Sequence, residues 1–297
     1  MIKSNNNKSW RQTPEWQATL SIVKFFAITF LAGLMFLPFI WMICTAFKSG
    51  IEVQSPHFWP KIFHPENFSV VLRLAPDKIR HTLLNLHLMR WVFNSVFVAS
   101  WVVTLQVVTS SMAAYAFSRI TWPWRDKFFI AYLATMMIPG LVLTIPQFQV
   151  MVSLDMVNSY RGLIIPGAFT AFGTFMLRQF MLGIPMSYNE SAEIDGASHL
   201  QIYLNIILPL TKPGLITLAI FTFLSSYRNL LWPLIMVKNP ALRTVPIGLL
   251  SFQGDYGTQT ELLMAATVIC TIPLVVIFII LQKKLVRGIN LGGGVKE

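Results

Sequence analysis

The sequence predicts an all-α, polytopic membrane protein with six transmembrane helices, on three observations. Hydrophobic residues make up 55% of the 297 residues and charged residues only 12%, about half of the roughly 25% usual in soluble domains. The mean hydropathy is +0.60. Apolar runs about twenty residues long recur along the chain, and a bilayer core of roughly 30 Å requires that length of a helix. These properties exclude a disordered chain, a coiled coil and an ordinary water-soluble enzyme.

Six apolar runs are the candidate spans: 20–47, 91–117, 128–152, 163–182, 214–237 and 262–281. Prolines interrupt the last four of them, at Pro139, Pro146, Pro166, Pro233 and Pro273. Membrane helices tolerate such breaks where neighbouring helices or water satisfy the freed backbone groups. The pattern therefore predicts a packed bundle around a pathway. The first run is too long for the apolar region of a signal peptide and is expected to be a permanent anchor.

The basic residues predict the orientation. The formal net charge is +11, from 23 basic and 12 acidic residues. With a cytoplasmic N-terminus, thirteen basic residues fall inside, nine fall outside and Arg228 lies within a span. Six of the outer nine lie in one long segment, where the positive-inside rule is weak. Both termini are thus predicted to be cytoplasmic. The chain divides into an N-terminal tail (1–18), a membrane domain (19–285) with an outer loop at 48–90, and a C-terminal tail (286–297).

The sequence shows no pattern typical of a nucleic-acid, metal, catalytic or nucleotide site. The basic residues flank apolar runs and form no stripe that nucleic acid would bind. Cys44 and Cys270 lie inside apolar runs, and we expect both to be small packing residues. The sequence has no metal-binding His/Cys cluster, no catalytic arrangement and no P-loop, so we expect no metal, no catalytic residue and no nucleotide on this chain.

The inner loop 185–212 has a distinctive pattern. Ser187 and Glu190 have the spacing of a capping box, and Glu190, Glu193 and Asp195 place negative charge near the start of the expected helix. Gly196 permits a sharp turn. A second amphipathic helix, with apolar residues from Leu200 to Leu208, is expected to end at Pro209 and Pro213. The pattern fits a knob that docks in a partner's groove as well as a loop lying on the membrane.

The residues of this loop resemble the EAA motif of ABC importer permeases. The matching positions are Glu190-Ser191-Ala192, Asp195-Gly196-Ala197 and Leu208-Pro209, with Ser191 in place of an alanine. The resemblance extends over about residues 26–296. It is strongest to maltose-type carbohydrate permeases, in particular to the shorter of their two permease subunits.

The resemblance implies a type I ABC importer permease fold in the cell inner membrane. It implies a heterodimer with a homologous permease, and two copies of a cytoplasmic ATPase that bind ATP and Mg. An external solute-binding protein would deliver the sugar. The eight motif residues would then form a cytoplasmic coupling helix and its flank, against the ATPase. This chain would be a transport subunit without enzyme activity.

The fifth run contains a charged residue, Arg228, beside Tyr227, Asn229 and Trp232. A charge inside a membrane helix costs a few kcal/mol and should face a polar pathway or an anionic partner. The resembled family commonly reads close to W-N-D-F-L-W-P here, so this chain is about two charge units more positive. Because guanidinium pairs with carboxylates, we predict that these four residues line the substrate pathway of an anionic glycan, such as a uronate oligosaccharide of the alginate or pectin type. An ion pair between Arg228 and the partner permease, a neutral sugar and a non-sugar solute remain open.

The outer loop 238–261 is rich in glycine and polar residues. The resemblance implies that its segment Gly254, Asp255, Tyr256 and Gly257 contacts the binding protein, and a plain connecting loop is the alternative. A self-sufficient ion-gradient carrier would need carboxylates within the spans and an internal repeat, and the sequence has neither. The second half of the outer segment, 77–91, is expected to form a short interfacial helix over the bundle.

Overall fold

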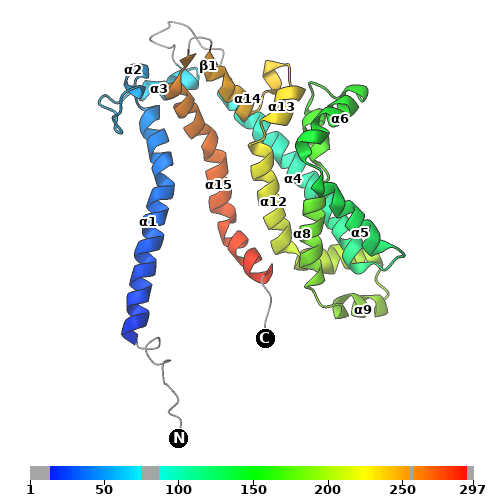
Figure 1. The fold of residues 1–297 in the computed structure, drawn as a ribbon. Helices are drawn as coiled ribbons and strands as arrows, with labels where there is room; N and C mark the ends of the chain where they lie inside the picture. The colour runs from blue at the N-terminus through cyan, green and yellow to red at the C-terminus, as the bar shows by residue number, and fades with distance from the viewer. Residues whose placement is uncertain (1–13, 75–86, 255–256, 293–297) are drawn as a thin grey trace.

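The computed structural model describes residues 14–74, 87–254 and 257–292, and within them it is almost entirely helical (Figure 1). Two-residue strands β1 (Gln253–Gly254) and β2 (Gly257–Thr258) form one small hairpin. The helices are α1 Pro14–Ala46, α2 Gly50–Val53, α3 Glu66–Val71, α4 Leu88–Arg119, α5 Arg125–Ala134, α6 Gly140–Ser153, α7 Tyr160–Ile164, α8 Ala171–Leu182, α9 Ser187–Ile194, α10 His199–Ile202, α11 Leu208–Leu210, α12 Lys212–Tyr227, α13 Leu231–Met236, α14 Val245–Leu249 and α15 Thr260–Gly292. The predicted all-α class is confirmed.

Three helices are long and apolar enough to cross a membrane unaided: Ala18–Ala46, Leu88–Arg119 and Thr260–Gln282. Two bent helix pairs bring the number in the described part of the chain to five. The expected spans 128–152, 163–182 and 214–237 each consist of shorter helices. Of the prolines predicted to interrupt the last four spans, Pro139 and Pro166 lie at breaks, whereas Pro146 and Pro273 lie inside α6 and α15.

The breaks lie where the backbone chemistry requires them. In the third run α5 and α6 meet at 98°, and Ile138 between them is extended, as a residue before proline prefers. In the fourth run a 3₁₀ turn at Ile165–Gly167 separates α7 from α8. In the fifth run α12 ends at Tyr227 and α13 begins at Leu231, so Arg228 lies at a helix end and not inside a continuous helix.

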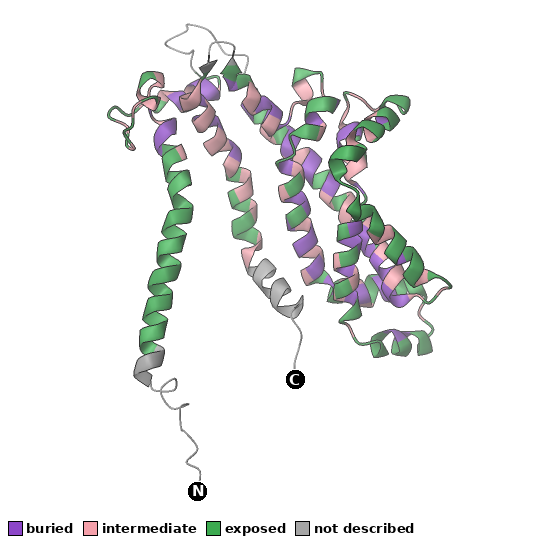
Figure 2. Ribbon diagram, in the orientation of Figure 1, coloured by how far each residue is buried: buried purple, intermediate pink, exposed green. Residues whose placement is uncertain are grey.

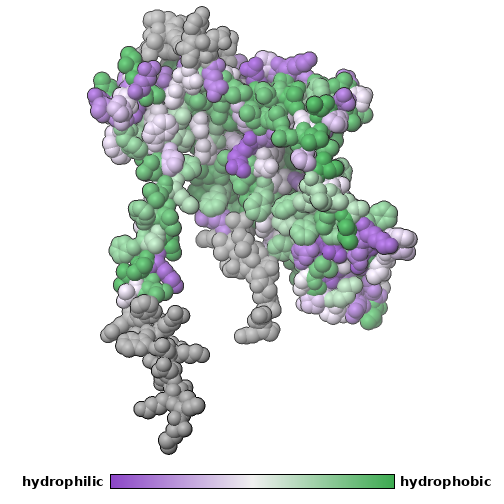
Figure 3. Space-filling model, viewed as in Figure 1, coloured by the Kyte–Doolittle hydropathy of each residue, from purple (hydrophilic) through white to green (hydrophobic). Residues whose placement is uncertain are grey.

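The buried core lies among α4, α8, α12 and α15, whereas α1 is exposed along almost its whole length (Figure 2). One cluster, with Trp91, Phe223 and Phe252 at its centre, joins α4, α12 and α15 near the hairpin end. A second joins α4, α8 and α12 to the segment α9–α11. Hydrophobic side chains dominate the middle of the molecular surface and hydrophilic ones gather at its two ends (Figure 3), as expected for a protein whose middle lies in lipid.

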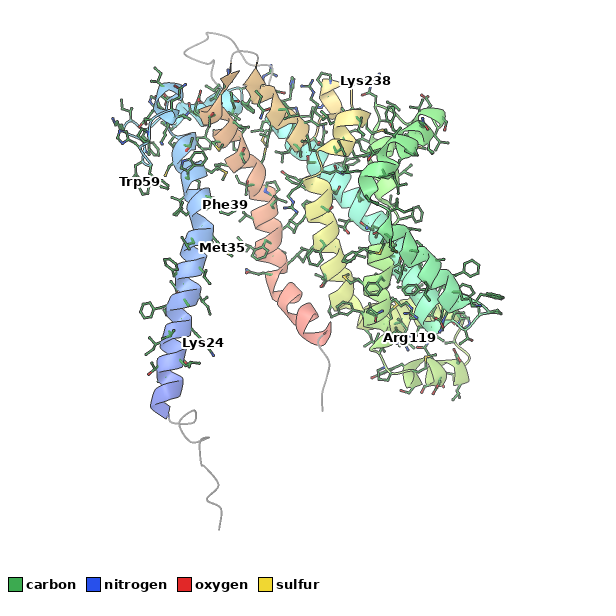
Figure 4. The ribbon with its side chains drawn as sticks, in the orientation of Figure 1. Lys24, Met35, Phe39, Trp59, Arg119 and Lys238 are labelled. Atoms are coloured by element: carbon green, nitrogen blue, oxygen red, sulfur yellow. The ribbon has the colours of Figure 1, made fainter. Side chains whose placement is uncertain are left out.

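The two ends of the molecule carry different loops. Lys238 and Arg119 mark these opposite ends (Figure 4). The first turn of α1 and the last turn of α15 lie toward the end that carries α9 (Figure 1). At the other end Asn67 donates to the carbonyl oxygens of Ala46 and Lys48, at 2.9 Å each, and so ties α3 to the end of α1. Most of the helix predicted at 77–91 falls outside the described residues, and 88–91 belong to α4.

Candidate functional site

The segment 185–212 forms a helix, an elbow and a second helix, as predicted. Gly196 has a φ of +79°, a left-handed conformation that glycine adopts without the steric cost of a Cβ. The second helix runs from His199 through a π-helical turn (Tyr203–Ile207) to Leu210, and a bend of 75° separates it from α12. The end predicted at Pro209 is therefore correct to one residue, and Pro213 lies in the first turn of α12, where proline is tolerated.

The predicted capping box at Ser187 and Glu190 is wrong. Helix α9 begins one residue earlier than predicted. Its N-cap residue is Met186, and no side chain caps it. The amide of Tyr188 donates to the carbonyl oxygen of Pro185, at 3.4 Å, so Ser187 is already helical and cannot cap. The capping box belongs instead to the second helix, where Ser198 and Gln201 bond each other's backbone amides.

The two faces of α9 differ in exposure. Asn189 and Ala192 are buried against the bundle, with relative exposures of 1% and 7%. Glu190, Ser191 and Glu193 are exposed, and the apolar side chain of Ile194 is 86% exposed. Of the other motif positions, Asp195, Gly196 and Pro209 are exposed, and Ala197 and Leu208 are half-buried. The EAA segment thus presents an outer surface of three carboxylates and an isoleucine, while Ala192 packs inward.

A cavity of about 820 Å³ opens among α4, α6, α8, α12 and α13. Its size falls within the range of roughly 300–1,000 Å³ typical of small-molecule sites. Apolar and aromatic side chains such as Phe169, Phe172 and Phe221 share its wall with polar ones. The polar side chains in the wall are Gln106, Thr144, Gln147, Thr170, Thr222, Ser225, Ser226, Arg228 and Asn229. Such a mixed lining can bind the polar rim and the apolar faces of a sugar ring.

Three of the four predicted pathway residues line this cavity: Arg228, Asn229 and Trp232. The Nε of Arg228 donates to the carbonyl oxygen of Leu224 at 3.3 Å, and no described carboxylate forms an ion pair with it. The side chain of Asn229 accepts from the amide of Trp232 at 3.3 Å, and the indole of Trp232 donates to the carbonyl oxygen of Gly162 at 2.9 Å. The exposed guanidinium is therefore available to a ligand.

Tyr227 does not belong to the cavity, which corrects the prediction. Its side chain is 3% exposed, stacks on Phe223 with ring centroids 5.8 Å apart, and donates from its hydroxyl to the carbonyl oxygen of Cys270 at 2.7 Å. Because α12 ends at this residue, successive side chains point in different directions. Tyr227 faces α15 and Arg228 faces the cavity.

Sequence reasoning missed the polar residues contributed by the other helices, above all Gln106 of α4 and Thr144 and Gln147 of α6. A signal for them was present. Gln106 is a polar residue inside an apolar run, and Thr144 and Gln147 are three positions apart, on one face of a helix. What the sequence lacks is any sign that these faces converge.

The outer loop 238–261 is folded onto the bundle. Asn239 opens a 3₁₀ turn, Pro240–Leu242, and the side-chain oxygen of Asn158 accepts from the amides of Lys238 and Asn239 at 3.1 and 2.8 Å. In the β1–β2 hairpin Gly254 pairs with Gly257. Asp255 and Tyr256, between them, lie outside the described residues.

An all-helical membrane domain with broken helices around a cavity of mixed polar and apolar lining, and with a helix–elbow–helix at one end, is the architecture expected of a transporter's permease subunit. Residues 89–291 match the model of the family described as binding-protein-dependent transport system inner membrane component. The chain belongs to this family and is a multi-pass carbohydrate ABC importer permease of the maltose type, a transport subunit and not an enzyme.

Two similar proteins are also named as permease proteins of transport systems. The chain is 36% identical to the arabinooligosaccharides transport system permease protein AraQ of Halalkalibacterium halodurans over 203 residues, 68% of this chain and 73% of AraQ. It is 34% identical to the sn-glycerol-3-phosphate transport system permease protein UgpE of Yersinia enterocolitica over 240 residues, 80% of this chain and 81% of UgpE. Its fold resembles that of a chain in the crystal structure of a bacterial ABC transporter for the acidic polysaccharide alginate. The TM-score is 0.75, the identity 22%, and the match covers 90% of this chain and 96% of that one.

Proposed function

We propose that the chain is one permease of an ATP-driven importer in the cell inner membrane, with both termini in the cytoplasm, and that an external binding protein hands it an oligosaccharide. The observation that carries the proposal is the helix–elbow–helix at one end of a bundle whose centre holds the cavity. The exposed side chain of Ile194 and the carboxylates beside it would fit a groove with an apolar floor and a basic rim in another protein. A separate ATPase at this surface would supply the energy.

The assembly proposed for transport follows from the family. A homologous second permease closes the pathway, two copies of the ATPase dock on the α9 side, and the binding protein docks on the side of the β1–β2 hairpin. Both described ends of the chain, in α1 and α15, lie toward the α9 side (Figure 1). That arrangement supports cytoplasmic termini once α9 is placed in the cytoplasm.

For the cargo we propose an anionic oligosaccharide, such as a uronate glycan. Relatives alone do not decide its charge, since one is named for arabinooligosaccharides and another for sn-glycerol-3-phosphate. The guanidinium of Arg228 favours an anionic cargo. It lines the cavity, and no described carboxylate pairs with it. A carboxylated sugar in the cavity would provide the bidentate acceptor that guanidinium prefers.

The test compares uptake of acidic and neutral trisaccharides by complexes reconstituted in liposomes. We expect Arg228→Ala to lower uptake of the uronate trisaccharide about tenfold or more, because a hydrogen bond to a charged group contributes about 1.5–3 kcal/mol. Uptake of a neutral trisaccharide should change less than twofold. Arg228→Lys is the matched control and should retain an intermediate activity, since it keeps the charge and loses the fork. Equal uptake of the uronate by the wild type and Arg228→Ala would remove the anionic assignment and favour a neutral cargo.

We further propose that the hairpin segment Gly254–Gly257 contacts the binding protein. Deleting 254–257 should reduce stimulation of the ATPase by the loaded binding protein, while the permease still co-purifies with the ATPase. If stimulation of the deletion variant equals that of the wild type, the segment is a plain connection.

A further inference from the structure

Arg119, the last residue of α4, has an unusual environment. Its side chain is only 6% exposed, at the end of the molecule that carries α9 (Figure 4). A buried guanidinium is costly unless it is paired, yet no described carboxylate forms an ion pair with it. Neutral groups from two other segments accept hydrogen bonds from its two terminal nitrogens, whereas its buried Nε has no hydrogen-bond partner among the described residues.

These acceptors join three elements. One terminal nitrogen of Arg119 donates to the carbonyl oxygens of Met181 and of Ile184, the latter at 2.7 Å. Met181 lies in the last turn of α8 and Ile184 lies two residues beyond its end, where the helix dipole is negative. The other terminal nitrogen donates to Asn189 Oδ1 and to the sulfur of Met186, at 3.4 Å each. Met186 is the N-cap residue of α9 and Asn189 is fully buried within it.

A second arginine makes a related but smaller link. Arg178 of α8 donates from Nε to the carbonyl oxygen of Phe117 in α4 at 3.1 Å, and it pairs with Asp126 of α5 at 3.5 Å. Arg178 thus fastens α8 to α4 and α5, and none of its described contacts is in α9. Of the two arginines, only Arg119 has described contacts with α9, the short helix that we place against the ATPase.

Helix α4 leads from this junction to the cavity. Gln106 of α4 lines the cavity and lies thirteen residues before Arg119, about 20 Å along the helix axis at 1.5 Å per residue. Helix α4 is continuous over this stretch. A rigid connection of α9 to the end of α4 would therefore carry a displacement of α9 to the cavity wall.

We propose that Arg119 is a positioning residue that couples α9 to the transmembrane helices, so that ATPase movement is converted into opening and closing of the cavity. This inference rests on the proposed function of α9 as the ATPase contact. Loss of the link should leave ATP hydrolysis active but uncoupled from transport. The ratio of solute imported to ATP hydrolysed is the property that Arg119 controls.

The experiment measures uptake of a labelled trisaccharide and phosphate release in the same liposomes, which hold the full complex with loaded binding protein. Arg119→Lys keeps the charge and loses the fork that reaches both α8 and α9. We expect its uptake per ATP to fall about tenfold, the factor for loss of one hydrogen bond to a charged group. Arg178→Lys is the matched control and should keep the ratio within twofold. An unchanged ratio in Arg119→Lys, or a proportional loss of uptake and ATPase activity, would overturn the inference.

A second variant covers the case in which Arg119→Lys fails to assemble. Asn189→Ala removes the one oxygen acceptor on α9, and it leaves the contact of Arg119 with the sulfur of Met186 and its bonds to the carbonyl oxygens of Met181 and Ile184. It should lower the ratio as well, and the double variant should be no worse than the stronger single one, because both changes break the same link. Additive losses would contradict the link.

Crosslinking of Ile194→Cys to the ATPase tests the docking separately. Failure of the wild-type background to crosslink would refute the proposed function, whereas normal crosslinking with an unchanged ratio would refute the role of Arg119 alone.

Discussion

At the scale of single residues, the direction of a side chain decides its role. Tyr227, Arg228 and Asn229 are consecutive, yet the first is buried against α15 and the other two line the cavity. The distinction arises because α12 ends there and the chain turns before α13. A charged side chain that ends a helix beside a cavity can also be solvated, which lowers the cost that a guanidinium would have inside a continuous span.

The conservative change Tyr227→Phe tests this assignment. It removes the 2.7 Å hydrogen bond to the carbonyl oxygen of Cys270, and we expect a loss of about 1 kcal/mol in stability. The KM for uptake should not change, because the ring faces away from the cavity. Thermal unfolding of the purified complex and uptake kinetics measure the two effects. Trp232→Ala, in the cavity wall, is the comparison and should raise KM. A raised KM in Tyr227→Phe would place the ring in the pathway after all.

At the scale of elements, the segment from α9 to α11 combines local and long-range control. Its elbow depends on one glycine, and its anchoring depends on distant partners. The hydroxyls of Tyr203 and Ser111 are 2.7 Å apart and fasten the second helix to α4. Arg119 fastens the first helix to the same α4. The elbow therefore joins two helices that are each held to one transmembrane helix.

Substitution of Gly196 tests the elbow. Its φ of +79° is costly for a residue with a Cβ. Apart from Gly196 itself and its two chain neighbours, no residue has an atom within 4 Å of the position that a Cβ would occupy, so the penalty is one of backbone conformation. We expect Gly196→Ala to cost about 1–2 kcal/mol and to lower the fraction of permease that co-purifies with the ATPase. Gly196→Asn should recover much of the loss, because asparagine tolerates the left-handed region. Equal behaviour of the two variants would contradict a conformational role.

At the scale of the whole molecule, buried polar residues fix the outer segments to the bundle. Asn94 of α4 is fully buried. It donates to the carbonyl oxygens of Ala241 and Arg243 at 3.0 and 2.8 Å, and it accepts from the hydroxyl of Tyr160 at 2.7 Å. One side chain thus connects α4, α7 and the outer loop near the cavity.

Replacing Asn94 by leucine should loosen that end of the molecule. Each polar group left buried without a partner costs about 1–3 kcal/mol, so we expect a clear fall in the thermal midpoint and faster proteolysis within 238–261. Tyr160→Phe removes only one of the three hydrogen bonds and should have a distinctly smaller effect on both measurements. If the two variants are equally stable, the contacts of Asn94 with the outer loop contribute little.

The sequence alone determined the membrane class, the helical fold, the helix–elbow–helix of 185–212 and three of the cavity residues. Hydropathy, helix dipoles and the conformational freedom of Gly196 are local properties, so they can be read from neighbouring residues. The sequence did not place the start of α9. The spacing of Ser187 and Glu190 predicted an N-cap at Ser187, whereas the helix begins after Met186, and the Pro185 carbonyl accepts from the amide of Tyr188.

The tertiary structure alone decided that Pro146 and Pro273 lie inside continuous helices, that Tyr227 faces α15, and that Gln106, Thr144 and Gln147 share a cavity with Arg228. It also decided that Arg119 joins α4 to residues 62 to 70 positions further along the chain. Such contacts depend on how separate helices pack. The physical reason is that the pattern within one helix specifies which residues share a face, whereas the partner of that face is specified only when the whole bundle is assembled.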